Sequence, residues 1–229
     1  MINTAKWLPS IFTFINLSLG FIALTLLYTD NTRLALSIII LALFFDGIDG
    51  RIARKLNVTS VVGKELDSLS DYFSFGIVPT YFYLVSPGEL SIPYYIPSII
   101  FLLFGTYHIA KYNAMFLYGS AKEEFPGLPI NVAGIIVAII GYLGVFPYFL
   151  EFIVIVVLGY LTITDIPYPS FKNYRPGKVY HLLIPIVAMI LFIGIPYLTL
   201  AVLSLYVIYG LVNKFIDFDN LKELKKHNI

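Results

Sequence analysis

The sequence contains no cysteine, and charged residues make up only 13% of its 229 positions. The absence of cysteine excludes disulfides, zinc–thiolate sites and cysteine nucleophiles. The charged share lies below the quarter or so that is usual in soluble domains, and 59% of the residues are hydrophobic. Because the net charge is +1 and no basic block is present, we expect no nucleic-acid partner. The composition therefore indicates an integral membrane protein.

Apolar segments of spanning or near-spanning length recur along the chain and predict an all-α, polytopic membrane bundle. We expect about eight transmembrane helices within residues 11–215, after an interfacial lead-in at 1–10 and before a charged cytoplasmic tail at 216–229. The length leaves room for this single domain, 1–229, and for no second large one. The expected helices are Ile11–Tyr28, Leu34–Lys55, a third that carries Asp67 and Asp71 on to about Val85, Ile96–Leu117, Ile130–Phe146, Phe149–Ile166, Val179–Ile195 and Tyr197–Phe215.

The distribution of basic residues supports this count. If the turn between Asp46 and Asp71 is cytoplasmic, fourteen of the fifteen Lys and Arg residues lie on its side, and only Arg33 lies on the other. This asymmetry agrees with the positive-inside rule, and adding or removing one span destroys it. We therefore expect both termini and the turn on the cytoplasmic face of the cell membrane.

Two pairs of aspartates stand at the ends of two neighbouring apolar segments. Asp46 and Asp49 are three residues apart, and Asp67 and Asp71 are four apart, so each pair lies on one face of a helix. Carboxylates at this depth are costly to desolvate, and a divalent cation bound by oxygen atoms is the simplest compensation. The alternative is that each aspartate pairs with a nearby Arg or Lys. Two helical pairs, joined by a short turn and flanked by glycines, favour the cation site.

The residues around these aspartates predict chemistry on a diphosphate. Four carboxylates around a small volume can hold two Mg²⁺ or Mn²⁺ ions about 4 Å apart, the arrangement that binds the attacking and leaving oxygens of a phosphoryl displacement. Arg51, Arg54 and Lys64 can neutralise the remaining phosphate charge. Gly50 and Ala53 lie one helical turn apart and leave a groove where a base or sugar can approach the backbone. A helix pair that opens toward the lipid interface would admit a lipid-linked substrate.

The same residues resemble the signature of the CDP-alcohol phosphotransferase family. In that family an acceptor alcohol attacks the lipid-bearing phosphorus and CMP leaves. The resemblance implies that the four aspartates bind two metal ions, that Asp71 is also the general base, and that the protein forms a homodimer. The matching positions are Asp46-x-x-Asp49-Gly50-x-x-Ala53-Arg54, eight residues, and Gly63-x-x-x-Asp67-x-x-x-Asp71. The residues expected to bind the CDP-lipid are Gly50, Ala53, Arg54, Gly63, Thr13 and Lys64.

Within this family the chain looks like the phosphatidylserine synthases. Relatives that use glycerophosphate usually carry a proline where Ser68 stands and lack the element Ser74-Phe75-Gly76. The resemblance implies transfer from CDP-diacylglycerol, or from CDP-archaeol in an archaeal host, to L-serine. The segments that also resemble this branch are Pro9–Gly20, Ala110–Asn113, Phe125–Pro129 and Tyr168–Lys172.

A serine acceptor needs a cation for its carboxylate and oxygen atoms for its ammonium group. Asn113 can offer one such oxygen, and Lys111 stands where the family usually has an arginine. We expect Asp165 either to pair with a basic residue of the following loop or to meet the substrate. The residues expected to bind serine are Lys111, Asn113, Lys172 and Arg175.

Three other functions compete with this interpretation. A membrane prenyltransferase also uses aspartates and Mg²⁺, but its two motifs are usually far apart in the chain, whereas Asp49 and Asp67 are 18 positions apart. A cation transporter tends to have repeated halves and mid-span carboxylates, and the sequence contains no second copy of the aspartate pattern. An inositol phosphate or glycerophosphate acceptor would keep the same chemistry and change only the product.

Overall fold

The computed structural model is mainly helical and describes residues 7–56, 58, 60–88, 91–117, 125–168 and 194–226. For Leu8, Phe116 and residues 49–56, 125–126 and 215–226 it describes the backbone alone. Most of the predicted lead-in and of the predicted helix Val179–Ile195 lie outside the described residues. The same is true of Lys172 and Arg175.

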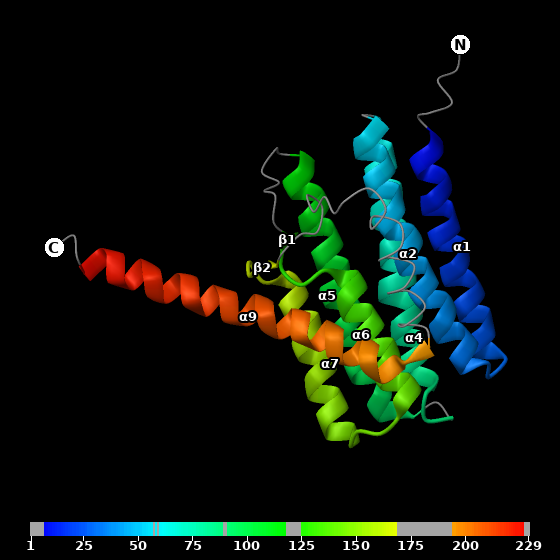
Figure 1. The fold of residues 1–229 in the computed structure, drawn as a ribbon. Coiled ribbons are helices and arrows are strands. Elements are labelled where there is room, and N and C mark those ends of the chain that lie inside the picture. The colour runs from blue at the N-terminus through cyan, green and yellow to red at the C-terminus, as the bar shows by residue number, and fades with distance from the viewer. Residues whose placement is uncertain are drawn as a thin grey trace, which may run out of the picture.

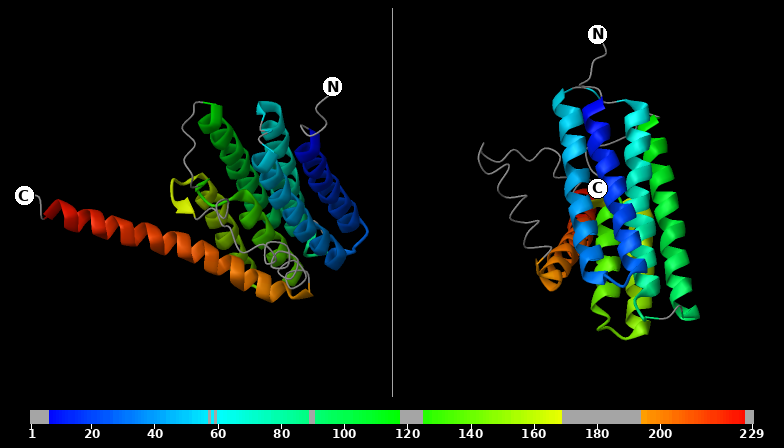
Figure 2. Two further views of the ribbon diagram at one scale, coloured as in Figure 1. Left: turned by 45° about the horizontal axis from the view of Figure 1, so that its top comes forward. Right: turned by 90° about the vertical axis from the view of Figure 1, so that its right-hand side faces the viewer.

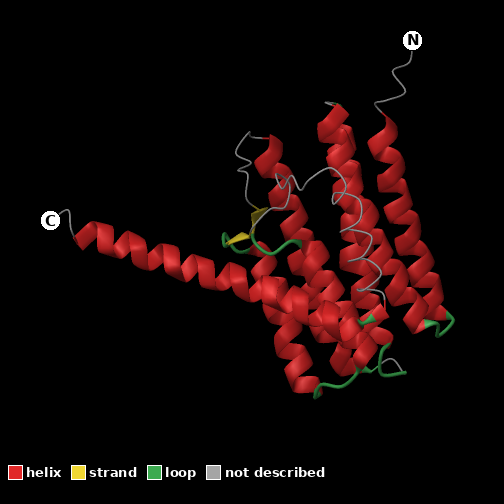
Figure 3. Ribbon diagram, in the orientation of Figure 1, coloured by secondary structure: helices red, strands yellow, loops and turns green. Residues whose placement is uncertain are grey.

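The first helices run up and down in one bundle (Figures 1 and 3). The predicted helices before residue 164 are all present, with ends shifted by a few residues. The third is continuous through three segments, because a π-helical turn joins two α-helices. The elements are α1 (Leu8–Tyr28), α2 (Thr32–Leu56), α3 (Val61–Asp71), the π-helix η2 (Tyr72–Ile77), α4 (Val78–Val85), α5 (Ile92–Leu117), α6 (Ile130–Leu143) and α7 (Tyr148–Ile163).

Several helices can cross a membrane by length and composition. The stretches Pro9–Tyr28, Ile92–Met115 and Pro196–Lys214 are long and apolar enough, and α6 and α7 are apolar but shorter. Large apolar side chains on these helices face outward, among them Leu103 and Leu205, each 65% exposed. An apolar outer surface of this extent is suited to lipid. The chain is an integral membrane protein.

The turn between α2 and α3 ends in a side-chain N-cap of α3. Ser60 is the N-cap of α3, and its hydroxyl accepts a hydrogen bond from the Gly63 backbone N–H at 3.0 Å. A Cβ atom on Gly63 would lie 3.0 Å from that hydroxyl, so the glycine allows the tight cap. This turn lies at the same end of the bundle as the start of α1 and the end of α5 (Figures 1 and 2). We call this end of the bundle the site end.

Two glycines of α6 hold the centre of the bundle together, as the sequence predicts for small residues in apolar helices. A Cβ atom on Gly134 would lie 1.9 Å from the carbonyl oxygen of Phe75, in η2. One on Gly141 would lie 2.9 Å from the Cα of Tyr83, in α4. Gly144 ends α6 in a left-handed conformation with φ +56°.

The loops after α5 and α7 meet in a short antiparallel pair. Strand β1 (Phe125–Pro126) pairs with β2 (Pro167–Tyr168). Gly127 follows with φ +92°, and its N–H donates to the carbonyl oxygen of Ile166 at 2.9 Å. β1 begins the stretch Phe125–Pro129, which resembles one family branch, and β2 ends at Tyr168, the first residue of another such stretch.

The last helix, α9 (Pro196–Lys226), lies across the bundle and projects beyond it (Figures 1 and 2). Its first half packs on α6 and β2, where the rings of Tyr168 and Tyr206 lie 5.6 Å apart. The helix includes the predicted span Tyr197–Phe215 and continues through the predicted charged tail as far as Lys226.

Candidate active site

Three of the four predicted aspartates converge at the site end of the bundle. Asp46 comes from α2, and Asp67 and Asp71 come from α3. One carboxylate oxygen of each lies within 4.8 Å of the others, and all three side chains are half-buried. Asp49 lies one turn after Asp46 on the backbone of α2, and its side chain is outside the described part.

Two asparagines donate hydrogen bonds to two of the three carboxylates. Asn16 of α1 donates from Nδ2 to Oδ1 of Asp71 at 3.1 Å, and Asn131 of α6 donates from Nδ2 to Oδ2 of Asp46 at 3.1 Å. Asn16 is fully buried, and its Oδ1 accepts no hydrogen bond from the described part of the chain. The cluster thus offers oxygen atoms alone, which is the donor set that Mg²⁺ and Mn²⁺ prefer. The residues fit a divalent cation.

The sequence analysis did not identify Asn16 or Asn131. A signal for both was available, because each is a polar amide within an otherwise apolar helical run. Polar side chains within membrane helices face the protein interior and tend to have a functional or packing role. The partner of each asparagine could not be read from the sequence, since the contacts join residues 55 and 85 positions apart.

We expect Asn131→Ala to weaken metal binding, because the Asp46 carboxylate loses the hydrogen bond that orients it. Removing such a supporting contact typically costs about 10- to 100-fold in metal affinity or activity. Mn²⁺ titration of the purified protein, followed by electron paramagnetic resonance, measures the effect. Asn31→Ala is the matched control, since Asn31 lies in the exposed turn between α1 and α2. Equal Mn²⁺ affinity in both variants would contradict a supporting role for Asn131.

Hydrogen bonds join α1 to the third helix on both sides of Asp71, and so fix the position of this aspartate along α1. Ser70 donates to the carbonyl oxygen of Thr13 at 3.1 Å, and Ser74 donates to that of Asn16 at 3.2 Å. A Cβ atom on Gly20 would lie 2.5 Å from the Ser74 hydroxyl oxygen, so the two helices are in direct contact there. The buried Thr13, expected in the CDP-lipid site, therefore lies where α1 packs on α3.

The π-helical turn η2 begins directly after Asp71. A π-turn inserts an extra residue into the helix, and this rotates the directions in which all later side chains of the helix point. Ser74, Phe75 and Gly76 of this turn are buried. The irregular backbone lies next to the aspartate cluster, as π-turns often do at functional sites.

The other residues expected to bind the CDP-lipid lie toward the site end, in the last part of α2 and the first turn of α3. Gly50, Ala53 and Arg54 lie in the last part of α2, beyond Asp46, and their side chains are outside the described set. Gly63 and Lys64 lie in the first turn of α3. The Lys64 ammonium lies 4.3 Å from the centre of the Tyr112 ring, a cation–π contact with α5.

The structure separates two residues that the sequence analysis assigned to serine. Lys111 faces α7, where its ammonium donates to the carbonyl oxygen of Ile163 at 3.0 Å and to the Asp165 carboxylate at 2.6 Å. Asp165 was expected either to pair with Lys172 or Arg175, which lie outside the described residues, or to meet the substrate; among the described residues it pairs with Lys111. The hydrogen bond and the positive charge of Lys111 lower the pKa of the exposed Asp165 carboxyl.

Asn113 faces the aspartate helix instead. Its side chain lies between Ser68 and Glu65 of α3, with hydrogen bonds to both. Two positions along an α-helix correspond to a rotation of about 200°, so Lys111 and Asn113 point to different neighbours. In this arrangement Asn113 is the one of the pair that borders the aspartate cluster.

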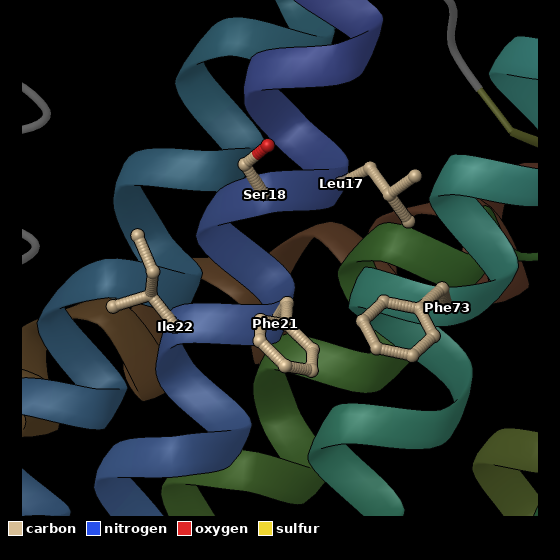
Figure 4. Close-up of a pocket in the computed structure, with 5 residues that line it drawn as sticks. All are labelled: Leu17, Ser18, Phe21, Ile22 and Phe73. Carbon is tan, nitrogen blue, oxygen red and sulfur yellow. The ribbon is translucent and has the colours of Figure 1, made fainter.

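An apolar groove opens between α1 and η2, just below the Asn16–Asp71 contact. It has a volume of about 480 Å³ and is lined by Leu17, Ser18, Phe21, Ile22 and Phe73. Figure 4 shows Leu17 and Phe21 of α1 pointing toward Phe73 of η2. Leu17 follows Asn16 in α1, and Phe73 comes two residues after Asp71, so the groove is lined by the helix segments that also carry Asn16 and Asp71.

A membrane bundle in which three carboxylates converge at one end defines a class of membrane-embedded proteins with a candidate divalent-cation site. Comparison with protein families identifies the class further: residues 6–164 match the CDP-alcohol phosphatidyltransferase model. The chain belongs to the CDP-alcohol phosphatidyltransferase family. This confirms the resemblance found in the sequence.

Named relatives cover most of the chain. It is 32% identical over 223 residues to a CDP-diacylglycerol–serine O-phosphatidyltransferase of Helicobacter pylori, covering 92% of each protein. It is 33% identical to a Methanocaldococcus jannaschii protein of the same name, covering 80% of this chain and 85% of the relative. An archaetidylserine synthase of Methanothermobacter thermautotrophicus is 28% identical, covering 71% of this chain and 69% of the relative.

Proposed function

We propose that the protein transfers the phosphatidyl or archaetidyl group of a CDP-linked lipid to the hydroxyl of L-serine and releases CMP. The observation that carries this proposal is the convergence of Asp46, Asp67 and Asp71 at the site end of a membrane bundle. The family shares transfer from a CDP-linked donor, and the relatives named above are called serine transferases or an archaetidylserine synthase.

The reaction is a displacement at phosphorus. The serine hydroxyl oxygen forms a bond to the lipid-bearing phosphorus, and the bond from that phosphorus to the bridging oxygen of CMP breaks. CMP leaves with the electron pair, and the hydroxyl proton passes to a base. We assign the base role to Asp71, since Asn16 orients its carboxylate.

The aspartates would hold one or two Mg²⁺ or Mn²⁺ ions, which when bound supply positive charge beside the diphosphate. Asp46, Asp67 and Asp71, with Asp49 as the fourth ligand of the motif, position that charge. Lys64 and Arg54 add fixed positive charge for the phosphate oxygens that remain. Gly50 and Ala53 leave room for the cytidine group.

The groove of Figure 4 is suited to a hydrocarbon chain of the donor. It is almost entirely apolar and open, and one of its lining residues, Phe73, comes two positions after Asp71. A lipid bound there would keep its chain in the membrane while its diphosphate reaches the aspartates. Either an acyl or an isoprenoid chain fits this chemistry.

We further propose eight spans, with both termini and the site end in the cytoplasm. The positive-inside asymmetry of the basic residues supports this orientation. The predicted seventh span is part of this proposal, and it lies outside the described residues. The homodimer implied by the family resemblance stays a prediction.

An acceptor panel tests the proposed function. Purified protein is incubated with CDP-dioleoylglycerol, Mn²⁺ and one labelled acceptor at a time: L-serine, glycerol 3-phosphate or inositol 1-phosphate. We expect label in the lipid fraction and stoichiometric CMP release with serine alone, and no reaction when the metal is chelated. Labelled product with a phosphate-bearing acceptor alone would reassign the acceptor. Absence of CMP release with every acceptor would contradict the enzyme assignment.

A further inference from the structure

Glu65, Ser68 and Asp71 follow one another at three-residue intervals along α3. Residues three apart are neighbours on a helix surface, so these side chains form a slanting row. Asp71 ends the row at the aspartate cluster, and Glu65 begins it one and a half turns nearer to the site end. Ser68 lies between them and is 5% exposed.

Asn113 of α5 connects the first two members of this row. Ser68 donates from Oγ to Oδ1 of Asn113 at 2.8 Å, and Asn113 donates from Nδ2 to Oε2 of Glu65 at 2.8 Å. The amide orientation follows from chemistry, because an ionised carboxylate only accepts hydrogen bonds and must face the NH₂ group. The Asn113 oxygen thus accepts the Ser68 hydrogen bond, and the Glu65 carboxylate is the charged acceptor of this group.

The negative charge in this network belongs to Glu65. Its carboxylate is half-buried, and the hydrogen bond it accepts comes from a neutral amide. The ion pair formed among the described residues is that of Lys111 with Asp165, so no described Lys or Arg neutralises Glu65. A partly desolvated carboxylate of this kind is suited to a cationic ligand, since a charge-assisted hydrogen bond offsets the desolvation.

We propose that Glu65 binds the ammonium group of the acceptor and so selects an amino alcohol, a refinement that rests on the proposed function. Six helical residues separate Glu65 from Asp71, a rise of about 9 Å. In a 2-amino alcohol the hydroxyl oxygen and the nitrogen are about 3 Å apart, and a hydrogen bond of about 2.8 Å at each end gives a span of roughly 8.5 Å. The rise along the helix axis is thus of the same order as the length that the acceptor and its two hydrogen bonds span.

The same charge should disfavour acceptors that carry a phosphate group. Glycerophosphate and inositol phosphate carry negative phosphate groups, which the Glu65 carboxylate repels. Ser68 and Asn113 are positioning residues, because they act through Glu65. The Asn113 amide fixes the carboxylate beside α5, and Ser68 fixes the amide.

The Glu65→Gln variant tests the proposal, since glutamine keeps an oxygen that can accept the Asn113 hydrogen bond and loses only the charge. The acceptors compared are L-serine and 3-hydroxypropionate, which has the same hydroxyl and carboxylate and no ammonium group. We expect the KM for serine to rise about 10- to 100-fold, the range for a hydrogen bond to a charged group. The kcat/KM ratio of serine to 3-hydroxypropionate should fall by the same factor, and Glu65→Asp should restore part of it. Asp30→Asn removes a carboxylate at the opposite end of the bundle and is the control.

Each outcome of this experiment supports or overturns the role of Glu65. A serine KM within twofold of the wild type would overturn the role of Glu65. A parallel fall with both acceptors, together with a raised KM for the CDP-lipid, would show a structural role instead and would also overturn it. If the wild type transfers nothing to serine, the proposed function fails first, and this is visible before any variant is compared.

Discussion

The Asp71→Asn variant is expected to lose nearly all transferase activity while remaining folded. The asparagine oxygen can still accept the hydrogen bond from Asn16, so the contact between α1 and α3 is kept. The variant cannot take up the acceptor proton, and it contributes a weaker ligand to the cation. A positioned general base contributes about 10²- to 10⁴-fold to a rate, and we expect kcat to fall by at least this range. CMP release from CDP-dioleoylglycerol and serine measures it.

Asp30→Asn is the matched control for this variant. Asp30 is an exposed aspartate in the turn between α1 and α2, with φ +57°, a conformation that asparagine also adopts readily. It should keep wild-type activity and thermal stability. Asp71→Asn with kcat within threefold of the wild type would remove Asp71 from the mechanism.

The Gly134→Ala variant should have the largest effect on stability among substitutions of one small residue. The added Cβ atom would lie 1.9 Å from the Phe75 carbonyl oxygen, so α6 must move away from η2. Forced expansion of a packed interior costs about 1–3 kcal/mol. Thermal unfolding in detergent should occur several degrees lower, since about 1 kcal/mol corresponds to 2–4 °C in a chain of this size. Activity should fall as well, because η2 begins next to Asp71.

Gly47→Ala provides the comparison, since a Cβ atom on Gly47 of α2 meets nothing within 4 Å. Alanine has the higher helix propensity, so this change should leave the unfolding temperature unchanged or raise it slightly. Equal unfolding temperatures for Gly134→Ala and Gly47→Ala would contradict the close contact between α6 and η2.

Hydropathy and aspartate spacing were enough to predict the helices and the centre of the site. The apolar runs predicted α1 through α7 with small errors at their ends, because each is longer than its connecting loops and ends at a polar or proline-containing turn. The three- and four-residue spacings placed each aspartate pair on one helix face. The convergence of Asp46 with Asp67 and Asp71 then required that α2 and the third helix approach each other at the site end, where α2 and α3 both pack on α1.

The contacts between distant segments could not be predicted in the same way. No local pattern marks the π-turn after Asp71, and its extra residue alters the facing of the rest of the helix. The pairing of β1 with β2 depends on where α5 and α7 end. The different directions of the Lys111 and Asn113 side chains could have been predicted from the sequence, since residues two positions apart on a helix point to different sides. The partners of each, Asp165 and Glu65, came only from the fold.

Anomalous diffraction from crystals grown with Mn²⁺ and the CDP-lipid tests the central claim most directly. The account predicts manganese peaks bounded by the carboxylates of Asp46, Asp67 and Asp71, with the diphosphate against them. Peaks elsewhere in the chain, or these carboxylates bound to arginine or lysine with no manganese between them, would contradict it.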